Sequence, residues 1–309
     1  MLLLMSQLGG GQEEIYRLHK FGSWSFGDVR RVKVVGGFLF VAKEDGVKVL
    51  NLITLKDSVK GVKLPEYITG ERPTDIVYYK RTMYVAYNTR TAPQIDVVDF
   101  GSGELKMSIP TGGSLISIAT GSHYLFALTS LGLEFYDVSD PVEPKEAGAL
   151  TFAGFTGTSM RVVFPYIYVA AGKDGLFIFK VSKGEVKKVL NFKPADGSPV
   201  IDVEVYGNYA FLACAKGGIK VLNTAKGQVV SEVETPHPIF ALRRYKKFLL
   251  GLFGSNGLKM YAIRDPLNPL LVAYYTNGQY LYDAGASGKY VVLAYGPSGV
   301  ITLKSNLLR

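Results

Sequence analysis

The sequence has little cysteine and no long hydrophobic run, and both absences narrow the class of protein. A single cysteine, Cys214, excludes an intramolecular disulfide. It lies in the apolar run 209–215, which is typical of a buried strand, so core packing is favoured over a reactive thiol. The apolar start, residues 1–5, is shorter than a signal-peptide core or a membrane span. We therefore expect a soluble chain without a transmembrane segment.

Other absences bear on the compartment and on chemistry. No asparagine begins an Asn-X-Ser/Thr acceptor site, so a cytoplasmic location is expected. Cell-surface association would follow if the start codon were misassigned and hid a leader sequence. The sequence has no Gly-rich phosphate loop, no nucleophile elbow and no pair of carboxylates flanking a nucleophile. No cofactor is expected.

Histidine is also scarce. The three histidines, His19, His123 and His237, show no metal-ligand spacing and are interpreted as solvated or packed side chains. Only His237, which lies between two prolines, remains a candidate acid or base.

Basic residues exceed acidic ones, with 35 Lys and Arg against 26 Asp and Glu and a net charge of +9. This excess permits acidic partners or anionic surfaces. No run reaches the five or six like charges that are typical of nucleic-acid tails, so nucleic acid is not the expected partner. The densest basic stretch holds Arg243, Arg244, Lys246 and Lys247.

Seven copies of one pattern run through the sequence. Each copy has an apolar alternation, a turn, a second apolar run that ends in a small residue, and a third apolar run. Glycines introduce the last five third runs and are 39 to 43 residues apart, at positions 132, 175, 218, 257 and 299. Periods of about 40 to 45 residues are typical of four-stranded propeller blades.

The repeat predicts an all-β fold, a seven-bladed β-propeller of four-stranded antiparallel blades, in a single domain over residues 13–309. The seventh repeat reaches the end of the sequence before an outer strand could form, whereas residues 14–20 look like a strand with no blade of their own. We predict that residues 14–20 supply the outer strand of the last blade and close the ring. Residues 1–12 are expected to be a flexible tail.

The third and sixth repeats end in similar proline-containing segments, Asp137-Val-Ser-Asp-Pro-Val-Glu-Pro144 and Arg264-Asp-Pro-Leu-Asn-Pro269. Together with the Asp-Val pairs and the Gly-led third runs, these segments resemble the LVIVD-repeat family of β-propellers over residues 28–304. The resemblance implies a propeller whose relatives are largely uncharacterised and often associated with prokaryotic cell surfaces. It implies no shared catalytic residues.

Acidic residues begin the first strand in four of the repeats, and strand polarity places them around one mouth of the central channel. They are Asp28, Asp75, Asp202 and Asp283, with Ser117, Arg161 and Ala241 in the other repeats. Such a carboxylate ring could hold a hard cation. The favoured alternative is structural, because an Asp that begins a strand accepts hydrogen bonds from turn amides. Lysines on the same face supply possible counter-charges, at Lys43, Lys173 and Lys216.

The loops that lead into the first strands crowd the same face, which we call the top face. They carry aromatic and charged side chains of the kind that anchor partners. The candidate binding residues are Trp24, Phe26, Arg72, Phe155, Arg161, His237, Phe240, Tyr280 and Tyr282. The alternative for each large ring is that it fills a gap between blades.

A propeller fold alone assigns no activity. The leading hypothesis is a monomeric, non-enzymatic scaffold that binds a protein or peptide across the top face, with the basic surface favouring acidic partners. The alternative is a metal-dependent propeller hydrolase of the lactonase type with its site in the central channel. A third possibility, a binder of nucleic acid or of an anionic surface, predicts affinity that falls steeply with salt.

Overall fold

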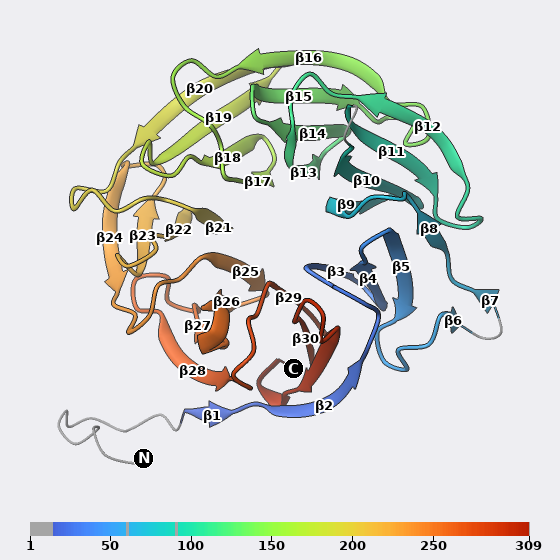
Figure 1. Cartoon of the computed structure of the whole chain (residues 1–309). Helices are drawn as coiled ribbons and strands as arrows, with labels where there is room; N and C mark the ends of the chain where they lie inside the picture. Colours follow the sequence, from blue (N-terminus) through green and yellow to red (C-terminus); the bar gives the residue numbers. More distant parts are fainter. Residues whose placement is uncertain (1–14, 60–61, 90–91, 309) are drawn as a thin grey trace.

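Seven β-sheets form a closed ring around a central channel, and the predicted seven-bladed propeller is confirmed (Figure 1). The computed structural model describes residues 15–59, 62–89 and 92–308. Within each blade the first strand lies innermost and the following strands pair with it in antiparallel order toward the outside. First strands therefore begin on the top face and end on the opposite, bottom face.

The first four blades follow one another along the chain. Blade 1 comprises β3 (Arg31–Val35), β4 (Phe38–Ala42), β5 (Gly46–Asn51) and β8 (Glu66–Ile68), with a separate hairpin of β6 (Ser58–Val59) and β7 (Val62–Lys63). Blade 2 comprises β9 (Pro73–Tyr79), β10 (Thr82–Asn88), β11 (Pro93–Asp99) and β12 (Leu105–Pro110). Blade 3 comprises β13 (Leu115–Gly121), β14 (Tyr124–Thr129), β15 (Gly132–Asp137) and β16 (Lys145–Thr151). Blade 4 comprises β17 (Ser159–Val163), β18 (Tyr166–Ala170), β19 (Leu176–Ser182) and β20 (Glu185–Phe192).

The last three blades complete the ring. Blade 5 comprises β21 (Asp202–Tyr206), β22 (Tyr209–Ala213), β23 (Ile219–Asn223) and β24 (Gln228–Val233). Blade 6 comprises β25 (Ala241–Tyr245), β26 (Phe248–Leu252), the 3-10 helix η1 (Gly254–Asn256), β27 (Leu258–Ala262) and β28 (Leu270–Tyr275). Blade 7 comprises β29 (Asp283–Ser287), β30 (Tyr290–Ala294) and β31 (Val300–Lys304), and η2 (Asn306–Leu308) follows. β1 (Tyr16–Arg17) and β2 (His19–Trp24) join blades 6 and 7.

Hydrophobic residues gather between neighbouring blades, with one core cluster at each of the seven junctions. Second and third strands are buried on both faces because a blade lies on either side, which explains their nearly continuous apolar runs. Cys214 lies in the cluster between blades 4 and 5, where burial raises the pKa of its thiol to about 12. The buried position predicted for this cysteine is confirmed.

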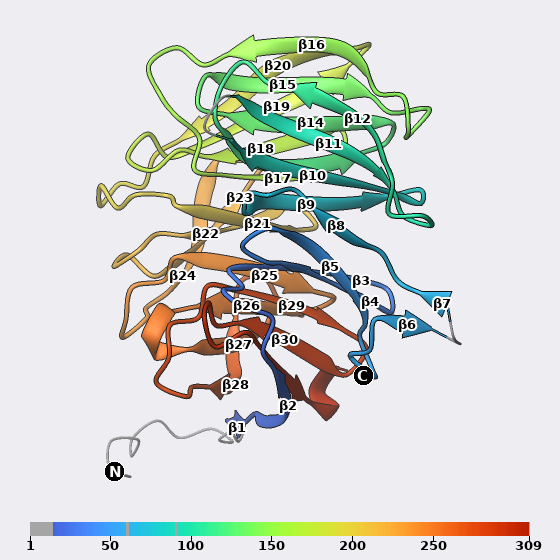
Figure 2. The ribbon, with the colours of Figure 1, turned by 45° about the vertical axis from the view of Figure 1, so that its right-hand side comes forward.

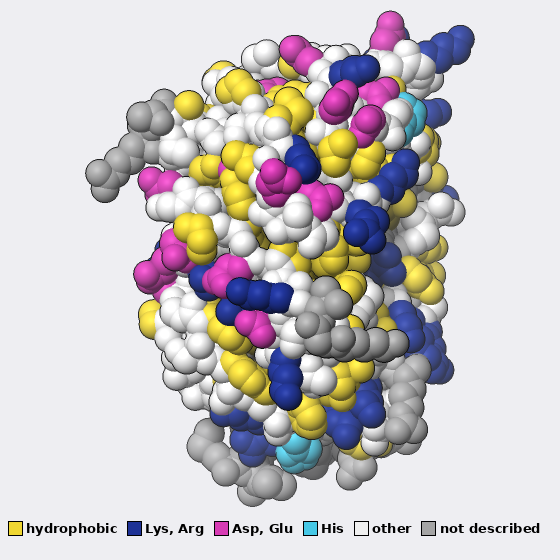
Figure 3. All heavy atoms as spheres, turned by 90° about the vertical axis from the view of Figure 1, so that its right-hand side faces the viewer, with side chains coloured by type: hydrophobic (Ala, Val, Ile, Leu, Met, Phe, Trp, Pro, Cys, Tyr) yellow, Lys and Arg dark blue, Asp and Glu magenta, His cyan; other side chains and the backbone are white. Residues whose placement is uncertain are grey.

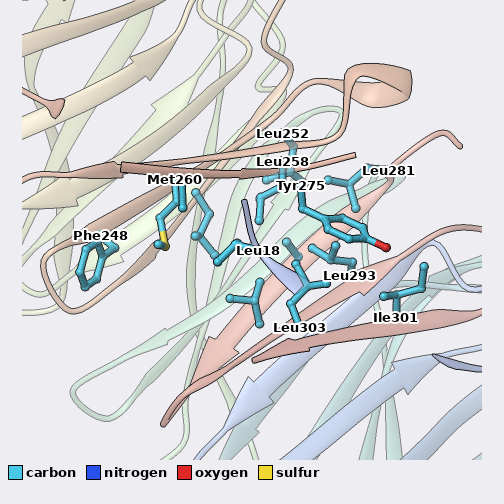
Figure 4. Close-up of a cluster of buried hydrophobic side chains, with 14 of the residues drawn as sticks. Leu18, Phe248, Leu252, Leu258, Met260, Tyr275, Leu281, Leu293, Ile301 and Leu303 are labelled. Carbon is cyan, nitrogen blue, oxygen red and sulfur yellow. The ribbon is translucent and has the colours of Figure 1, made fainter. Parts of the chain in front are cut away.

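The N-terminal strand closes the ring, as predicted, but it lies later in the sequence than residues 14–20. His19–Trp24 form β2, the outer strand of blade 7, and pair antiparallel with β31. Tyr16–Arg17 instead pair parallel with β28 of blade 6. Leu18 is the reason for this division, because its side chain is only 4% exposed and packs between the two blades, near Met260 and Leu303 (Figure 4). Glu14 lies outside the described residues.

Candidate functional site

Three of the predicted aspartates fasten neighbouring blades together. The carboxylate of Asp75 accepts a hydrogen bond from the Ile118 N–H of blade 3 at 3.1 Å. Asp202 accepts one from Leu242 N–H of blade 6 at 2.9 Å, and Asp283 accepts one from Val32 N–H of blade 1 at 3.1 Å. Each also accepts a bond from the amide that follows it in its own strand. These carboxylates therefore tie one inner strand to the next.

The alignment of the first strands that the sequence predicts is wrong in two blades. Asp75, Asp202 and Asp283 each pair with the last alanine of the second strand in their own blade. In blade 1 that position is Arg31, so Asp28 lies three residues upstream, ahead of the strand. In blade 4 it is Ser159, which lies two residues ahead of Arg161. Arg161 therefore sits within the channel and not among the residues that begin the first strands.

The channel between the inner strands encloses a cavity of about 510 Å³ whose lining is rich in charge. The Arg243 guanidinium bridges Asp202 of blade 5 and Asp283 of blade 7, at 2.9 and 2.7 Å. Arg161 of blade 4 pairs with Glu204 of blade 5 at 2.8 Å. These ion pairs cross the junctions between blades 4, 5, 6 and 7.

The charged groups of the channel change one another's pKa values. Burial would raise the pKa of Asp202, but Arg161 and Arg243 outweigh it and hold the pKa below its usual range. Lys33 of blade 1 also lines the channel, without an ion pair to any described residue. The surrounding walls lower the pKa of Lys33 by desolvation, although solvent reaches part of its side chain, and nearby Asp75 opposes the shift.

The four candidate metal ligands do not converge. Asp28 lies ahead of β3 and shares its carboxylate between Arg30 and Arg72, at 2.9 and 2.7 Å. The other three belong to blades 2, 5 and 7 and bind backbone amides. Across the described residues, no three His, Cys, Asp or Glu side chains are grouped so that they could hold a metal ion.

Saturating Ca²⁺ or Mg²⁺ is expected to leave the melting temperature of EDTA-treated protein unchanged. The carboxylates already accept hydrogen bonds from amides and guanidinium groups, so a cation would have to displace those partners. A site occupied at 100 times its Kd would add about 2.7 kcal/mol of stability, which thermal unfolding detects readily. A rise of several degrees would instead support the metal site and the hydrolase of the lactonase type.

A chain of aromatic and arginine side chains lies beside the channel mouth on the top face. Phe240 stacks on Tyr280 with ring centroids 5.7 Å apart, and Tyr280 contacts Tyr282 at 4.9 Å. The guanidinium carbon of Arg30 lies 5.2 Å from the Tyr282 ring centroid. We call Arg30, Arg72, Phe240, Tyr280 and Tyr282 the top-face cluster. It spans blades 6, 7, 1 and 2, and Phe240 and Tyr282 also line the channel cavity.

The remaining predicted binding residues lie apart from this cluster. Trp24 and Phe26 pack against the core between blades 7 and 1. Phe155 stacks on Phe177 with ring centroids 3.7 Å apart and helps to fill the junction of blades 3 and 4. His237 is exposed in the loop before blade 6. Sequence reasoning missed Arg30, although its position two residues after Asp28 is the spacing at which the two side chains pair.

No helix in the described part of the chain has the length and apolar character needed to cross a membrane.

Comparison with known proteins identifies the repeat and finds the same fold in solved structures. The LVIVD repeat model matches residues 26–50 and 198–222. These segments cover the first three strands of blades 1 and 5, and not the third and sixth repeats whose proline-containing segments carry the resemblance. No curated protein matches the chain significantly.

Solved structures show the same architecture at low sequence identity. The WD40 repeats of RRP9 superpose with a TM-score of 0.75 at 9% identity, over 93% of this chain and 97% of that one. U3-55K gives 0.74 at 9% identity, over 93% and 98%. The WD40 β-propeller domain of Doa1 gives 0.71 at 13% identity, over 92% and 94%. At such identities the likeness shows the fold alone, and the chain is thus a seven-bladed β-propeller that carries the LVIVD repeat in its first and fifth blades.

Proposed function

We propose that the chain is a non-enzymatic binding scaffold that holds a protein or peptide on its top face, as a monomer in the cytoplasm. The observation that carries the proposal is the top-face cluster. Ring and cation–π contacts join its side chains from Phe240 of blade 6 to Arg30 of blade 1, and the Asp28 carboxylate links Arg30 to Arg72 of blade 2. All of them stand on loops that a rigid ring positions.

The exposure of the cluster suits a binding role. Tyr280 is 48% exposed although it contacts both Phe240 and Tyr282, and the Arg30 side chain is 47% exposed. Tyr and Arg are the residues that dominate binding energy in protein interfaces, because they bury large areas and retain polar groups for hydrogen bonds. A partner that covers this cluster would bury both side chains.

The charges of the cluster favour an acidic segment in the partner. Arg30 and Arg72 share one buried carboxylate, that of Asp28. The single negative charge of Asp28 balances only one of the two guanidinium charges, so the group has an excess positive charge. Glu44 approaches Arg72 only at 3.8 Å, and its side chain is 65% exposed. An aspartate or glutamate of the partner could therefore reach Arg30 while an apolar side chain covers Tyr280.

Selection of displayed random peptides on the immobilised protein tests this proposal. Peptides enriched on the wild-type protein are expected to contain acidic and apolar residues. Their affinity for the Tyr280→Ala and Arg30→Gln variants is expected to be lower by about 30-fold or more, since interface anchors contribute about 2 kcal/mol or more. Leu131→Ala serves as the matched control, because Leu131 is an exposed apolar residue of the top face outside the cluster. Peptides that bind all four proteins equally would contradict the proposal.

A further inference from the structure

A group of basic side chains surrounds the channel on the bottom face, opposite the top-face cluster. In each blade the turn between the first and second strands lies beside this end of the channel. The seven turns are residues 36–37, 80–81, 122–123, 164–165, 207–208, 246–247 and 288–289. They contain five Lys and Arg residues and no Asp or Glu. With the neighbouring Arg244, these form what we call the basic collar: Lys80, Arg81, Arg244, Lys246, Lys247 and Lys289.

The collar cations have no acidic partners. Among the described residues, every ion pair of the protein lies elsewhere, including those of the top-face lysine Lys43 with Glu66 and of Arg72 with Asp28. Figure 3 shows Lys and Arg side chains gathered toward the right-hand edge of the side view, the side on which the C-terminus lies in Figure 2. The collar therefore presents positive charge that no described acidic side chain pairs with, and the exposed acidic residues of this face, such as Asp140 and Asp265, lie in the outer connections between third and fourth strands.

The backbone conformation of these turns does not favour lysine or arginine. Lys80 and Arg81 both have positive φ, 45° and 67°, and Lys246 has φ 52°. Side chains other than Gly or Asn are disfavoured in this region. At the matching first turn position, blades 1, 5 and 7 have glycine, namely Gly36, Gly207 and Gly288, each with φ 58°. Glycine would thus suit the turns better, and the lysines and arginine occupy these positions at a conformational cost.

Aromatic rings beneath the collar support the cations at the surface. The Lys80 ammonium lies 5.1 Å from the Tyr79 ring centroid, and the Lys246 ammonium lies 5.3 Å from that of Tyr245. These cation–π contacts leave the ammonium groups free to donate hydrogen bonds to an external anion. The collar is therefore held in place and still available.

Exposed apolar side chains project from the same face around the collar. Ile53 in blade 1 is 60% exposed, Phe164 in blade 4 is 41% exposed and Leu267 in blade 6 is 48% exposed. All three lie in turns or connections on the bottom face. Of these three side chains only Phe164 has a ring on which a nucleic-acid base could stack, whereas proteins that bind single strands use several aromatic rings to stack successive bases. Cations combined with apolar tips are instead what binds a protein to the interface of an anionic bilayer.

We propose that the bottom face docks on the surface of an anionic lipid bilayer. The basic collar lies against the lipid phosphates, and Ile53, Phe164 and Leu267 enter the interfacial region around it. This inference goes beyond the proposed top-face function, because docking by the bottom face leaves the top-face cluster directed away from the membrane and open to a partner.

Co-sedimentation with vesicles tests the proposal. The wild-type protein is expected to bind phosphatidylcholine vesicles that contain 30% phosphatidylglycerol, and to bind pure phosphatidylcholine vesicles far more weakly. In the variant Lys80→Asn/Arg81→Gly, the partition coefficient is expected to fall about 30-fold, since each cation near a charged surface contributes about fivefold. The turn tolerates Asn and Gly at positive φ, so this variant should be at least as stable as the wild type.

Further variants separate the alternatives. Lys173→Gln/Lys216→Gln removes the same charge from exposed turns of the top face and is expected to change vesicle binding by about twofold or less, because those charges lie beyond a Debye length from the membrane. Ile53→Ser/Leu267→Ser is expected to weaken binding about tenfold.

Equal binding to both kinds of vesicle, or undiminished binding by the collar variant, would overturn the proposal. Binding to oligo(dT) but not to vesicles would also overturn it and assign the collar to nucleic acid. Peptide binding at the top face by the collar variant tests the proposed function separately.

Discussion

Replacement of Asp202 by alanine is expected to lower the free energy of unfolding by about 3–5 kcal/mol, because it leaves the Leu242 N–H without its acceptor and the Arg243 guanidinium with only one of its two carboxylates. The Asp202 side chain is 5% exposed and binds the Arg243 guanidinium at 2.9 Å and the Leu242 N–H at 2.9 Å. It also accepts hydrogen bonds from Ser159 of blade 4 and from the amide of Val203. One truncation therefore removes contacts among blades 4, 5 and 6.

Urea unfolding followed by circular dichroism measures the loss. The matched control is Asp174→Ala, which removes an Asp from the top face of blade 4 where it pairs with Lys193 at 3.1 Å. That side chain is 39% exposed, so the control is expected to cost less than about 1 kcal/mol. A similar decrease in the free energy of unfolding for the two variants would mean that the Asp202 hydrogen bonds and ion pair between inner strands contribute little to stability.

The pH dependence of the Asp202→Ala effect follows from the lowered pKa of Asp202. A carboxyl group whose pKa is lower in the folded state contributes stability at pH values above its unfolded pKa, which is about 3.9. That contribution is lost as the pH falls through the lower, folded pKa. The difference between wild type and variant should therefore be constant from pH 7 to about 5 and shrink below about pH 4.

Removal of residues 1–24 is expected to destabilise the protein by more than about 5 kcal/mol, since burial of Leu18 alone corresponds to 2–5 kcal/mol. The deletion also takes away the whole pairing of β2 with β31 and exposes the edge of blade 7. The control lacks residues 1–14 and retains β1, Leu18 and β2, so it keeps all the described contacts that close the ring.

Thermal unfolding of the two truncated proteins checks the closure. The chain without residues 1–24 should unfold at a lower temperature or fail to fold cooperatively, and an added peptide spanning residues 13–26 should raise its melting temperature by binding to the open edge. Equal melting temperatures for the two proteins would show that β2 is not required for closure.

Sequence periodicity was sufficient to predict the blades but not the side-chain register across them. A strand that is shifted by two residues keeps the same side chains on the same face. This is why Arg161 could be placed two residues from its true position without disturbing the apolar pattern of blade 4. Asp28 was misplaced for a different reason, because the Asp-Val pair of blade 1 resembles those of other blades although it lies three residues ahead of the matching position, Arg31.

The residues that the top-face prediction grouped together separate once the fold is known. Phe240, Tyr280 and Tyr282 form one cluster, whereas Trp24 and Phe155 pack into junctions between blades. Large aromatic rings have the same pattern in sequence whether they fill a junction or stand at the surface. Their burial depends on the neighbouring blade, which lies about 40 residues away in a propeller.

The amino-acid sequence by itself determined the strands, the turns between them, the number of blades and the need for an N-terminal strand to close the ring. These features follow from local alternation and from a repeat whose units must bury their apolar faces against one another. Only the tertiary structure decided which polar groups meet at the channel. Asp202 and Arg243 are 41 residues apart, and Asp283 and Val32 are 251 residues apart. Ring closure brings these groups within hydrogen-bonding distance, and no pattern within one repeat specifies such contacts between different blades.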